Sequence, residues 1–313
     1  MRIIYFGTPE FALKILKGIE GQKDIEIAAI VSSPDKPSGR GKKITSPPVA
    51  IYARQAGYPL LQPENLSDEE FLSTLQSFKA DLFVVVAYRK LPNKVWQMPP
   101  MGTINFHPSY LPDYRGAAPI NWAIINGETQ TGITIFFINE NIDSGDIILQ
   151  ETIAINFDDT ADTLSEKIIK RGVPLLIKAI KQIENNNITP IPQHQLGNNL
   201  HKAPKITKQH RKIDWSKKSI EIYNLIRGLS KKPTAWTLLN KDGNILTVKI
   251  YFSIAEKIEH SYEPGEIIIE KKRLKIATSD GFIIPTEIQL EGKKILNNQQ
   301  FLAGFRFKKA KFL

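Results

Sequence analysis

The sequence contains no cysteine and no long hydrophobic run. Without cysteine, disulfides, thiolate catalysis and cysteine-based zinc sites are excluded. No stretch approaches the roughly 20 consecutive apolar residues that a membrane helix needs. The segment Met1–Gly7 lacks the long apolar region and the small-residue cleavage site of a signal peptide, and is typical instead of a first β-strand. These features together predict a cytoplasmic protein.

The sequence also lacks the three-glycine pattern of a dinucleotide-binding loop. Gly7-Thr8-Pro9-Glu10 follows the first predicted strand, where such a loop would lie. Pro9 and Glu10 would crowd and repel a pyrophosphate, so nicotinamide chemistry is disfavoured. His194, His201 and His210 are seven and nine residues apart, which matches no metal-binding pattern. No metal site is therefore predicted.

Positive charge is concentrated in the last third of the chain. The chain has 313 residues, more than one hydrophobic core usually serves, so two domains are expected. Residues 1–204 carry 20 Lys and Arg against 21 Asp and Glu, a balance of −1, whereas residues 205–313 carry 22 against 11, a balance of +11. Short lysine runs usually only solvate a surface, but a whole basic domain favours a polyanionic partner such as a nucleic acid.

The first half alternates short apolar runs with helical patterns. Phe11–Ile19 has one apolar helical face. A longer helix is expected to begin near Thr160 and run past Ile180, with a break or restart at Pro174. This alternation predicts an α/β fold with a mostly parallel, Rossmann-like sheet covered on both faces. The expected strands are Arg2–Phe6, Ile25–Val31, Asp81–Ala87, Thr103–His107 and Gly132–Ile138.

The composition and the apolar periodicity of the sequence change after Asn185. The stretch Thr189–Lys205 is polar, contains proline and has no apolar period, which is typical of a linker. Five short strands in a basic domain then favour a small barrel of the oligonucleotide-binding (OB) type. We therefore divide the chain into a domain at 1–188, a linker at 189–206 and a basic OB-like domain at 207–313. The expected elements of the last part are a helix at Ser219–Leu229 and strands at Ala235–Leu239, Ile245–Phe252, Gly265–Ile269, Leu274–Ala277 and Phe282–Ile284.

Asn105 and His107 are candidates for chemistry. They are two residues apart in a predicted strand, so their side chains point to the same face. A carboxamide can donate to a developing oxyanion, while an imidazole with a pKa of about 6.5 accepts or relays a proton, and both suit acyl transfer. A polar strand end without a role explains the same spacing equally well.

Two further segments hold candidate residues. Asp143 or Asp146 could orient His107 and stabilise its charged form, although an ordinary Asp/Gly turn accounts for the same residues. The segment Ser33–Lys43 follows a strand end and contains Arg40, Lys42 and Lys43 beside glycines. This loop suits a phosphate contact or a solvated surface equally well.

Taken together, these segments resemble the methionyl-tRNA formyltransferase family over essentially the whole chain. The motifs that carry the resemblance are "RIIYFGTPEF", "PDKPSGRGKK", "DLFVVVAY", "INFHPSYLPDYRGAAPINWAIINGE", "TGITIFF", "IDSGDI", and "IDW" followed by "IRGLSKKPTAW". The resemblance implies a formyltransferase domain with a C-terminal OB-like barrel. It also implies formyl transfer from the co-substrate 10-formyltetrahydrofolate to the methionyl α-amine of initiator tRNA, by a monomer without a metal.

The resemblance also assigns roles to individual residues. It makes Asn105, His107 and Asp143 catalytic, which resolves the choice between the two aspartates. Ser109, Tyr110, Leu111 and Pro112 correspond to the family's folate-contacting segment, and Arg40, Lys42 and Lys43 to its tRNA-contacting loop. The chain departs from the family at Pro108, at Tyr110 and over Arg89–Pro92, a segment that borders the folate pocket in the family.

Overall fold

The computed structural model describes residues 1–38, 43–197, 201–304 and 309–313. The chain forms two compact units that interleave along the sequence. The first unit consists of Met1–Gly116, Thr131–Ile153 and Ser165–Lys202, and the second of Ala117–Gln130, Ala154–Leu164 and Ala203–Leu313. Two segments that precede residue 188 thus belong to the second unit, and the division at 188 and 207 stays a proposal. None of the helices in the described ranges is both long and apolar enough to span a bilayer.

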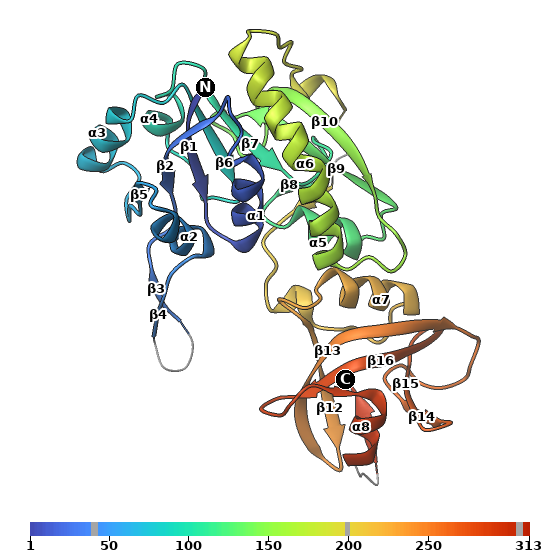
Figure 1. The fold of residues 1–313 in the computed structure, drawn as a ribbon. Coiled ribbons are helices and arrows are strands. Elements are labelled where there is room, and N and C mark those ends of the chain that lie inside the picture. The colour runs from blue at the N-terminus through green and yellow to red at the C-terminus, as the bar shows by residue number, and fades with distance from the viewer. Residues whose placement is uncertain (39–42, 198–200, 305–308) are drawn as a thin grey trace. The chain divides into compact units, whose positions relative to one another are not determined.

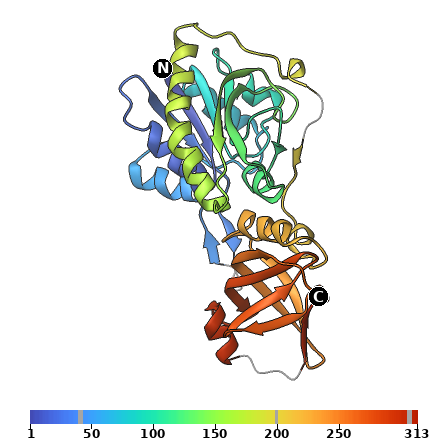
Figure 2. The ribbon, with the colours of Figure 1, turned by 90° about the vertical axis from the view of Figure 1, so that its right-hand side faces the viewer.

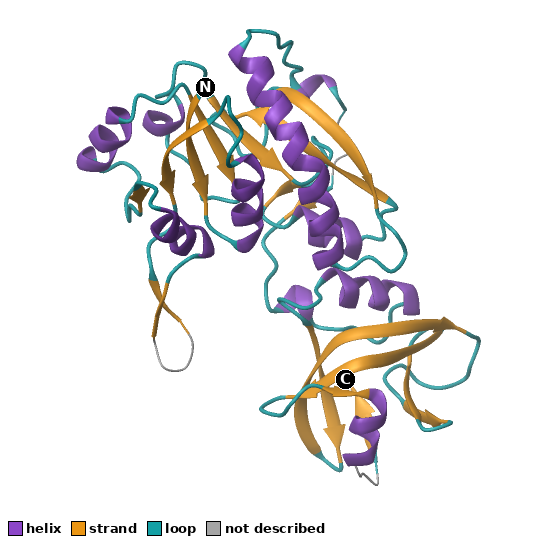
Figure 3. Cartoon of the chain, in the orientation of Figure 1, coloured by secondary structure: helices purple, strands orange, loops and turns teal. Residues whose placement is uncertain are grey.

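A seven-stranded sheet forms the centre of the first unit (Figures 1 and 3). In spatial order its strands are β10 (Ile147–Ala154), β9 (Gln130–Phe137), β7 (Thr103–His107), β6 (Leu82–Val86), β1 (Arg2–Gly7), β2 (Glu26–Val31) and β5 (Leu60–Leu61). Neighbouring strands from β5 to β7 are parallel, and β9 is antiparallel to β7. The predicted mostly parallel sheet is confirmed, and its five expected strands match β1, β2, β6, β7 and β9.

Helices cover both faces of this sheet. On one face, the ring of Phe106 lies 5.8 Å from that of Phe11 in α1 (Glu10–Ile19). Phe106 also meets Gly172 of α6 (Ala161–Glu184), where an added Cβ would lie 2.3 Å from the ring. On the other face, side chains of the sheet pack in an apolar cluster with Phe71 of α3 (Glu69–Ser77) and Val95 of α4 (Asn93–Trp96). A further helix, α2, spans Pro48–Ala56. Figure 2 shows α6 lying across its sheet.

The break expected at Pro174 is wrong, because α6 continues through it from Ala161 to Glu184. Pro174 is exposed, so the backbone carbonyl that loses its partner can bond to water. Gly172, Leu176 and Ile180 on the buried side anchor the helix on both sides of the proline. Packing of this apolar face therefore outweighs one missing hydrogen bond.

An antiparallel barrel forms most of the second unit, which confirms the predicted OB-like domain. Its main strands follow the order β14-β15-β16-β13-β12-β18. A backbone hydrogen bond from Phe312 to the carbonyl of Gly265, and a bridge between Glu266 and Lys311, bring the two ends of this order together. The elements of this unit are α5 (Pro119–Ile125), α7 (Ser219–Gly228), β12 (Ala235–Lys241), β13 (Asn244–Lys257), β14 (Ile267–Glu270), β15 (Arg273–Ala277), β16 (Gly281–Leu290), β17 (Leu296–Asn297), α8 (Asn298–Gly304) and β18 (Ala310–Phe312).

The segment predicted as a linker is attached to the first unit. Ile191 exchanges two backbone hydrogen bonds of 2.8 Å with Ile147. Gln193, in a 3-10 turn at Gln193–Gln195, has only 2% of its surface exposed. Further along, β11 (Lys202–Ala203) pairs with β8 (Arg115–Gly116). Backbone pairing and one buried polar side chain therefore hold this segment on the first unit, while most of its described polar residues are exposed.

Candidate active site

Strand β7 presents Asn105 and His107 on one face of the sheet. Asn105 lies beside Val85 of β6 and Phe136 of β9, and His107 lies beside Thr134 of β9. Because strand residues alternate, both side chains point away from the face where Phe106 packs against α1 and α6. Asn105 is half-buried, and the His107 side chain is 5% exposed. Among the described residues, no hydrogen bond engages the Asn105 carboxamide, so this group is free to bind a ligand.

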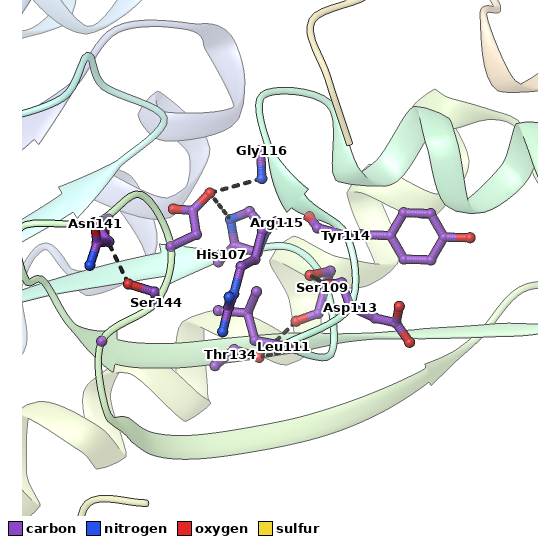
Figure 4. A network of polar contacts seen from close by, with 12 residues as sticks. His107, Ser109, Leu111, Asp113, Tyr114, Arg115, Gly116, Thr134, Asn141 and Ser144 are labelled. Carbon is purple, nitrogen blue, oxygen red and sulfur yellow. Dashed lines mark hydrogen bonds and ion pairs between the residues drawn. The ribbon is translucent and has the colours of Figure 1, made fainter. Parts of the chain in front are cut away.

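The His107 ring lies between a backbone carbonyl and a carboxylate (Figure 4). Its Nε2 lies 3.0 Å from the carbonyl oxygen of Tyr114, and its Nδ1 lies 3.8 Å from Oδ2 of Asp143. A carbonyl oxygen can only accept, so Nε2 carries a proton and donates a hydrogen bond to the Tyr114 carbonyl. In the neutral ring, Nδ1 therefore keeps its lone pair. A proton added at Nδ1 would face the Asp143 carboxylate.

Asp143 is held in place by its own loop and by a neighbouring one. The backbone N–H of Gly116 donates to Asp143 Oδ2 over 2.9 Å. Asp143 has a φ of 50°, a left-handed conformation that its surroundings must maintain. Gly145 packs so closely on Phe137 that an added Cβ would lie 1.7 Å from the carbonyl oxygen. Asp146 is exposed, so the structure brings Asp143 and not Asp146 to His107.

The loop after β7 contains the predicted folate-contacting residues, and its polar groups are largely bonded within the protein. The Ser109 hydroxyl donates to the carbonyl of Asp113 over 2.7 Å. The Thr134 hydroxyl donates to the Ser109 carbonyl over 2.8 Å and accepts from the N–H of Leu111 over 3.0 Å. Ser109 and Leu111 are fully buried. These two residues therefore shape the loop from inside.

Tyr110 is the exposed residue of the predicted folate-contacting segment. It has 47% of its surface exposed, while Pro112 is buried. The Tyr110 side chain lies over Gly132 of β9, where an added Cβ would be 2.8 Å from Tyr110 Cβ. Tyr110 is consequently the member of Ser109–Pro112 whose side chain is most available to a ligand. The folate-binding role of this segment stays a prediction.

The predicted tRNA-contacting loop is described only at its base. Arg40 and Lys42 lie outside the described residues. The backbone of Lys43 pairs with that of Ser38, in the hairpin of β3 (Lys36–Ser38) and β4 (Lys43–Thr45). At the base of the hairpin, a hydrogen bond from Gln62 is the main cause that lowers the pKa of Asp35, which also bonds to Arg54.

The segment Arg89–Pro92, where the chain departs from the family pattern, is fixed by its first and third residues. The Arg89 guanidinium donates to the carbonyl of Glu64 over 2.7 Å and to that of Pro63. Leu91 is 3% exposed and packs in the same apolar cluster as α3 and α4. The departure therefore ties this segment to the chain around Pro63.

Several groups at the site were not identified from the sequence. The Tyr114 carbonyl and the Gly116 N–H are backbone groups, which every residue type carries. Thr134 sits inside an apolar strand, and Gln193 lies in the segment predicted as a linker. Only Gly116, with a φ of 130°, gives a sequence signal, because glycine marks unusual backbone conformations. Within the described ranges, no cluster of three His, Asp or Glu side chains could hold a metal ion.

Known proteins are similar to this chain over nearly its whole length. The model of the formyl transferase family matches residues 1–180, and that of the formyl transferase C-terminal domain matches residues 205–306. The methionyl-tRNA formyltransferase of Flavobacterium johnsoniae is 46% identical over 307 residues, which cover 98% of this chain and 97% of that protein. The methionyl-tRNA formyltransferase of Bacteroides fragilis is 44% identical over 315 residues, with 99% and 97% covered.

Solved structures share the fold at lower identity. HypX from Aquifex aeolicus in complex with tetrahydrofolic acid has a TM-score of 0.65 at 20% identity, over 97% of this chain and 47% of that one. The sugar 3N-formyl transferase WlaRD, solved with dTDP and 5-N-formyl-THF, has a TM-score of 0.65 at 22% identity, over 94% and 99%. The two family models and the full-length relatives lead to one conclusion: the chain belongs to the methionyl-tRNA formyltransferase family.

Proposed function

We propose that the chain transfers the formyl group of 10-formyltetrahydrofolate to the α-amino group of methionyl-initiator tRNA, with Asn105, His107 and Asp143 as the catalytic residues. The observation that carries the proposal is the position of the His107 ring, between the Tyr114 carbonyl and the Asp143 carboxylate. The unbonded carboxamide of Asn105 lies on the same face of β7. An oxyanion donor and a proton acceptor are the groups that formyl transfer to an amine requires.

His107 accepts the proton at Nδ1 in this proposal. The attacking amine must be neutral, and the pKa of an α-amino group is about 7.7–8.0, so a base effective near neutrality suffices. As the amine nitrogen bonds to the formyl carbon, it loses a proton to Nδ1. The resulting imidazolium donates a hydrogen bond to the Tyr114 carbonyl through Nε2, and the Asp143 carboxylate, 3.8 Å from Nδ1, stabilises its charge. The bond from the formyl carbon to the folate nitrogen then breaks, and that nitrogen takes up the proton.

Asn105 stabilises the oxygen of the tetrahedral intermediate. Its carboxamide N–H₂ can donate to the oxyanion without first breaking a bond within the described protein. A donor that is already oriented by a β-strand needs little rearrangement when the charge develops. Tyr110 lies in the loop that follows β7, and its side chain is exposed. We assign it, with Ser109, Leu111 and Pro112, to the folate-binding part of the site.

The tRNA is bound mainly through positive charge. The excess of 11 positive charges lies in residues 205–313, which is the part of the chain that forms the barrel. Lysine and arginine side chains bind phosphates with release of counterions. We assign Arg40, Lys42 and Lys43 to contacts near the acceptor end of the tRNA. The protein acts in the cytoplasm as a monomer.

The decisive experiment supplies the purified protein and 10-formyltetrahydrofolate with three acceptors. These are charged initiator tRNA, charged elongator tRNA and a small amine such as a dTDP-amino sugar. We expect formylation of the methionyl-initiator tRNA and none of the sugar. Formylation of the sugar alone would overturn the proposed substrate. Formylation of none of the three acceptors would overturn the proposed reaction. Light scattering of the same sample tests whether the protein is a monomer.

A further inference from the structure

Gln193 connects the two loops that hold His107. Its Nε2 donates to the carbonyl of Gly145 over 2.7 Å. Its Oε1 accepts from Nε and from one terminal nitrogen of Arg115, over 3.0 and 2.7 Å. With 2% of its surface exposed, this carboxamide is buried and bonded at both ends. Arg115 is labelled beside His107 in Figure 4.

Each bonded loop supplies one of the groups next to the ring. Arg115 lies between Tyr114, whose carbonyl accepts from His107, and Gly116, whose N–H donates to Asp143. Gly145 follows two residues after Asp143, which faces His107 Nδ1. A shift of either loop would therefore change the distance between Nδ1 and the carboxylate.

Both loops have backbones that need external support. Tyr114 has a φ of 59° and Asp143 a φ of 50°, in the left-handed region that side chains with a Cβ disfavour. Such conformations persist where the surrounding structure determines them. Here the support comes from the segment predicted as a linker: His201 accepts from the Tyr114 N–H over 2.8 Å and stacks on the Tyr114 ring, while Gln193 holds Gly145 and Arg115.

We infer that Gln193 is a positioning residue for formyl transfer, which fixes Asp143 and the Tyr114 carbonyl on either side of His107 by tying their loops together. The inference rests on the proposed function, because it gives Gln193 a role only if His107 and Asp143 carry the reaction. Gln193 itself does not touch the reacting atoms. Its contribution is the placement of groups that do, and misplacement of a catalytic group by about 1 Å can cost about 10²-fold in rate.

The test compares two variants of the full-length protein. Gln193→Glu keeps an oxygen that accepts from Arg115 but replaces the donor to Gly145 with a second acceptor. Thr103→Val is the matched control, because Thr103 is also 2% exposed and its hydroxyl donates to the carbonyl of Trp96 over 2.7 Å. Each variant thus removes one buried bond from a side chain to a carbonyl, in the same unit.

For Gln193→Glu we expect the single-turnover formylation rate at saturating tRNA and folate to fall about tenfold or more. The KM values for both substrates should stay within about twofold, because no substrate contact is removed. The pH–rate profile should also change, since the surroundings of His107 Nδ1 change. Thr103→Val should lower the melting temperature and leave rate and pH profile near those of the wild type.

An unchanged rate and pH profile in folded Gln193→Glu would overturn the inference, and so would an equal loss of rate in Thr103→Val. If Gln193→Glu does not fold, Arg115→Lys provides the second measurement, since lysine cannot place two donors on the Gln193 oxygen. It should show the same fall in rate with unchanged KM, and an unchanged rate would overturn the inference. Wild-type activity in the same assay separates these outcomes from failure of the proposed function.

Discussion

The end of strand β7 and the barrel of the second unit use polar residues in opposite ways. At the end of β7, a few polar groups are buried, bonded inside the protein and set at fixed distances around His107. In residues 205–313, 22 lysines and arginines outnumber 11 acidic residues, and many of these cations lie on the surface. Proton transfer depends on the place of single atoms, whereas attraction of a polyanion depends on the sum of many charges.

This difference predicts how the two regions respond to substitution. One change near His107 should cost orders of magnitude in rate, because no second group can take its place. One lysine removed from the barrel should cost little, because each phosphate contact contributes a small share. The loop at Arg40 is expected to lie between these limits, since it is proposed to contribute discrimination as well as attraction.

Of three substitutions that compare the two regions, Asp143→Asn should have the largest effect, with a fall of about 10²-fold in single-turnover rate. The neutral carboxamide can still accept from Gly116, but it no longer stabilises a protonated His107. Asp146→Asn is the matched control, because Asp146 is exposed and lies in the same loop. If Asp146→Asn lowered the rate strongly and Asp143→Asn left it unchanged, the assignment of Asp143 would be wrong.

Arg40→Lys should have an intermediate effect, of about tenfold on formylation of the initiator tRNA. A planar guanidinium can bond in two-pronged fashion or stack on an unpaired base, and a lysine offers only a point charge. Overall tRNA affinity should change much less. We propose to measure formylation and binding for initiator and elongator tRNAs in parallel. Unchanged initiator formylation would show that the loop binds phosphate only and does not discriminate between tRNAs.

Lys232→Ala should have the smallest effect. Lys232 is exposed in the second unit, so its loss should weaken binding of different tRNAs about equally and lower the slope of log affinity against log salt by about 1 if it contacts a phosphate. Lys23→Ala, at an exposed position of the first unit, is the control and should leave the slope unchanged. Equal slopes for both variants would contradict the division of charge between the units.

The sequence predicted regular elements well where local pattern and packing agree. Strand β7 has the predicted bounds, and the β12–β13 hairpin turns at Asp242-Gly243, between two strands that were predicted. The break at Pro174 was wrong because the contribution of packing along α6 is not visible in a local pattern. Helix α8 and strand β18 were missed, since short terminal elements such as Ala310–Phe312 depend on partners distant in sequence.

The candidate site was predictable only in part. Spacing placed Asn105 and His107 on one face, but it left Asp143 and Asp146 equivalent until the resemblance to the family was considered. The contact from Gly116 to Asp143 spans 27 residues and uses a backbone group, which no motif identifies. Gln193 was assigned to a linker because composition alone does not distinguish a solvated glutamine from one bonded to Arg115 and Gly145.

The most direct test of the account is the single-turnover formylation rate of Asn105→Ala with methionyl-initiator tRNA and 10-formyltetrahydrofolate, measured together with tRNA affinity. Removal of one oxyanion donor typically costs about 10²–10³-fold in rate. We therefore expect a loss of this size with unchanged folding and unchanged tRNA binding, because the Asn105 side chain makes no hydrogen bond within the described structure. A near-normal rate would contradict the proposal that the polar face of β7 performs the transfer.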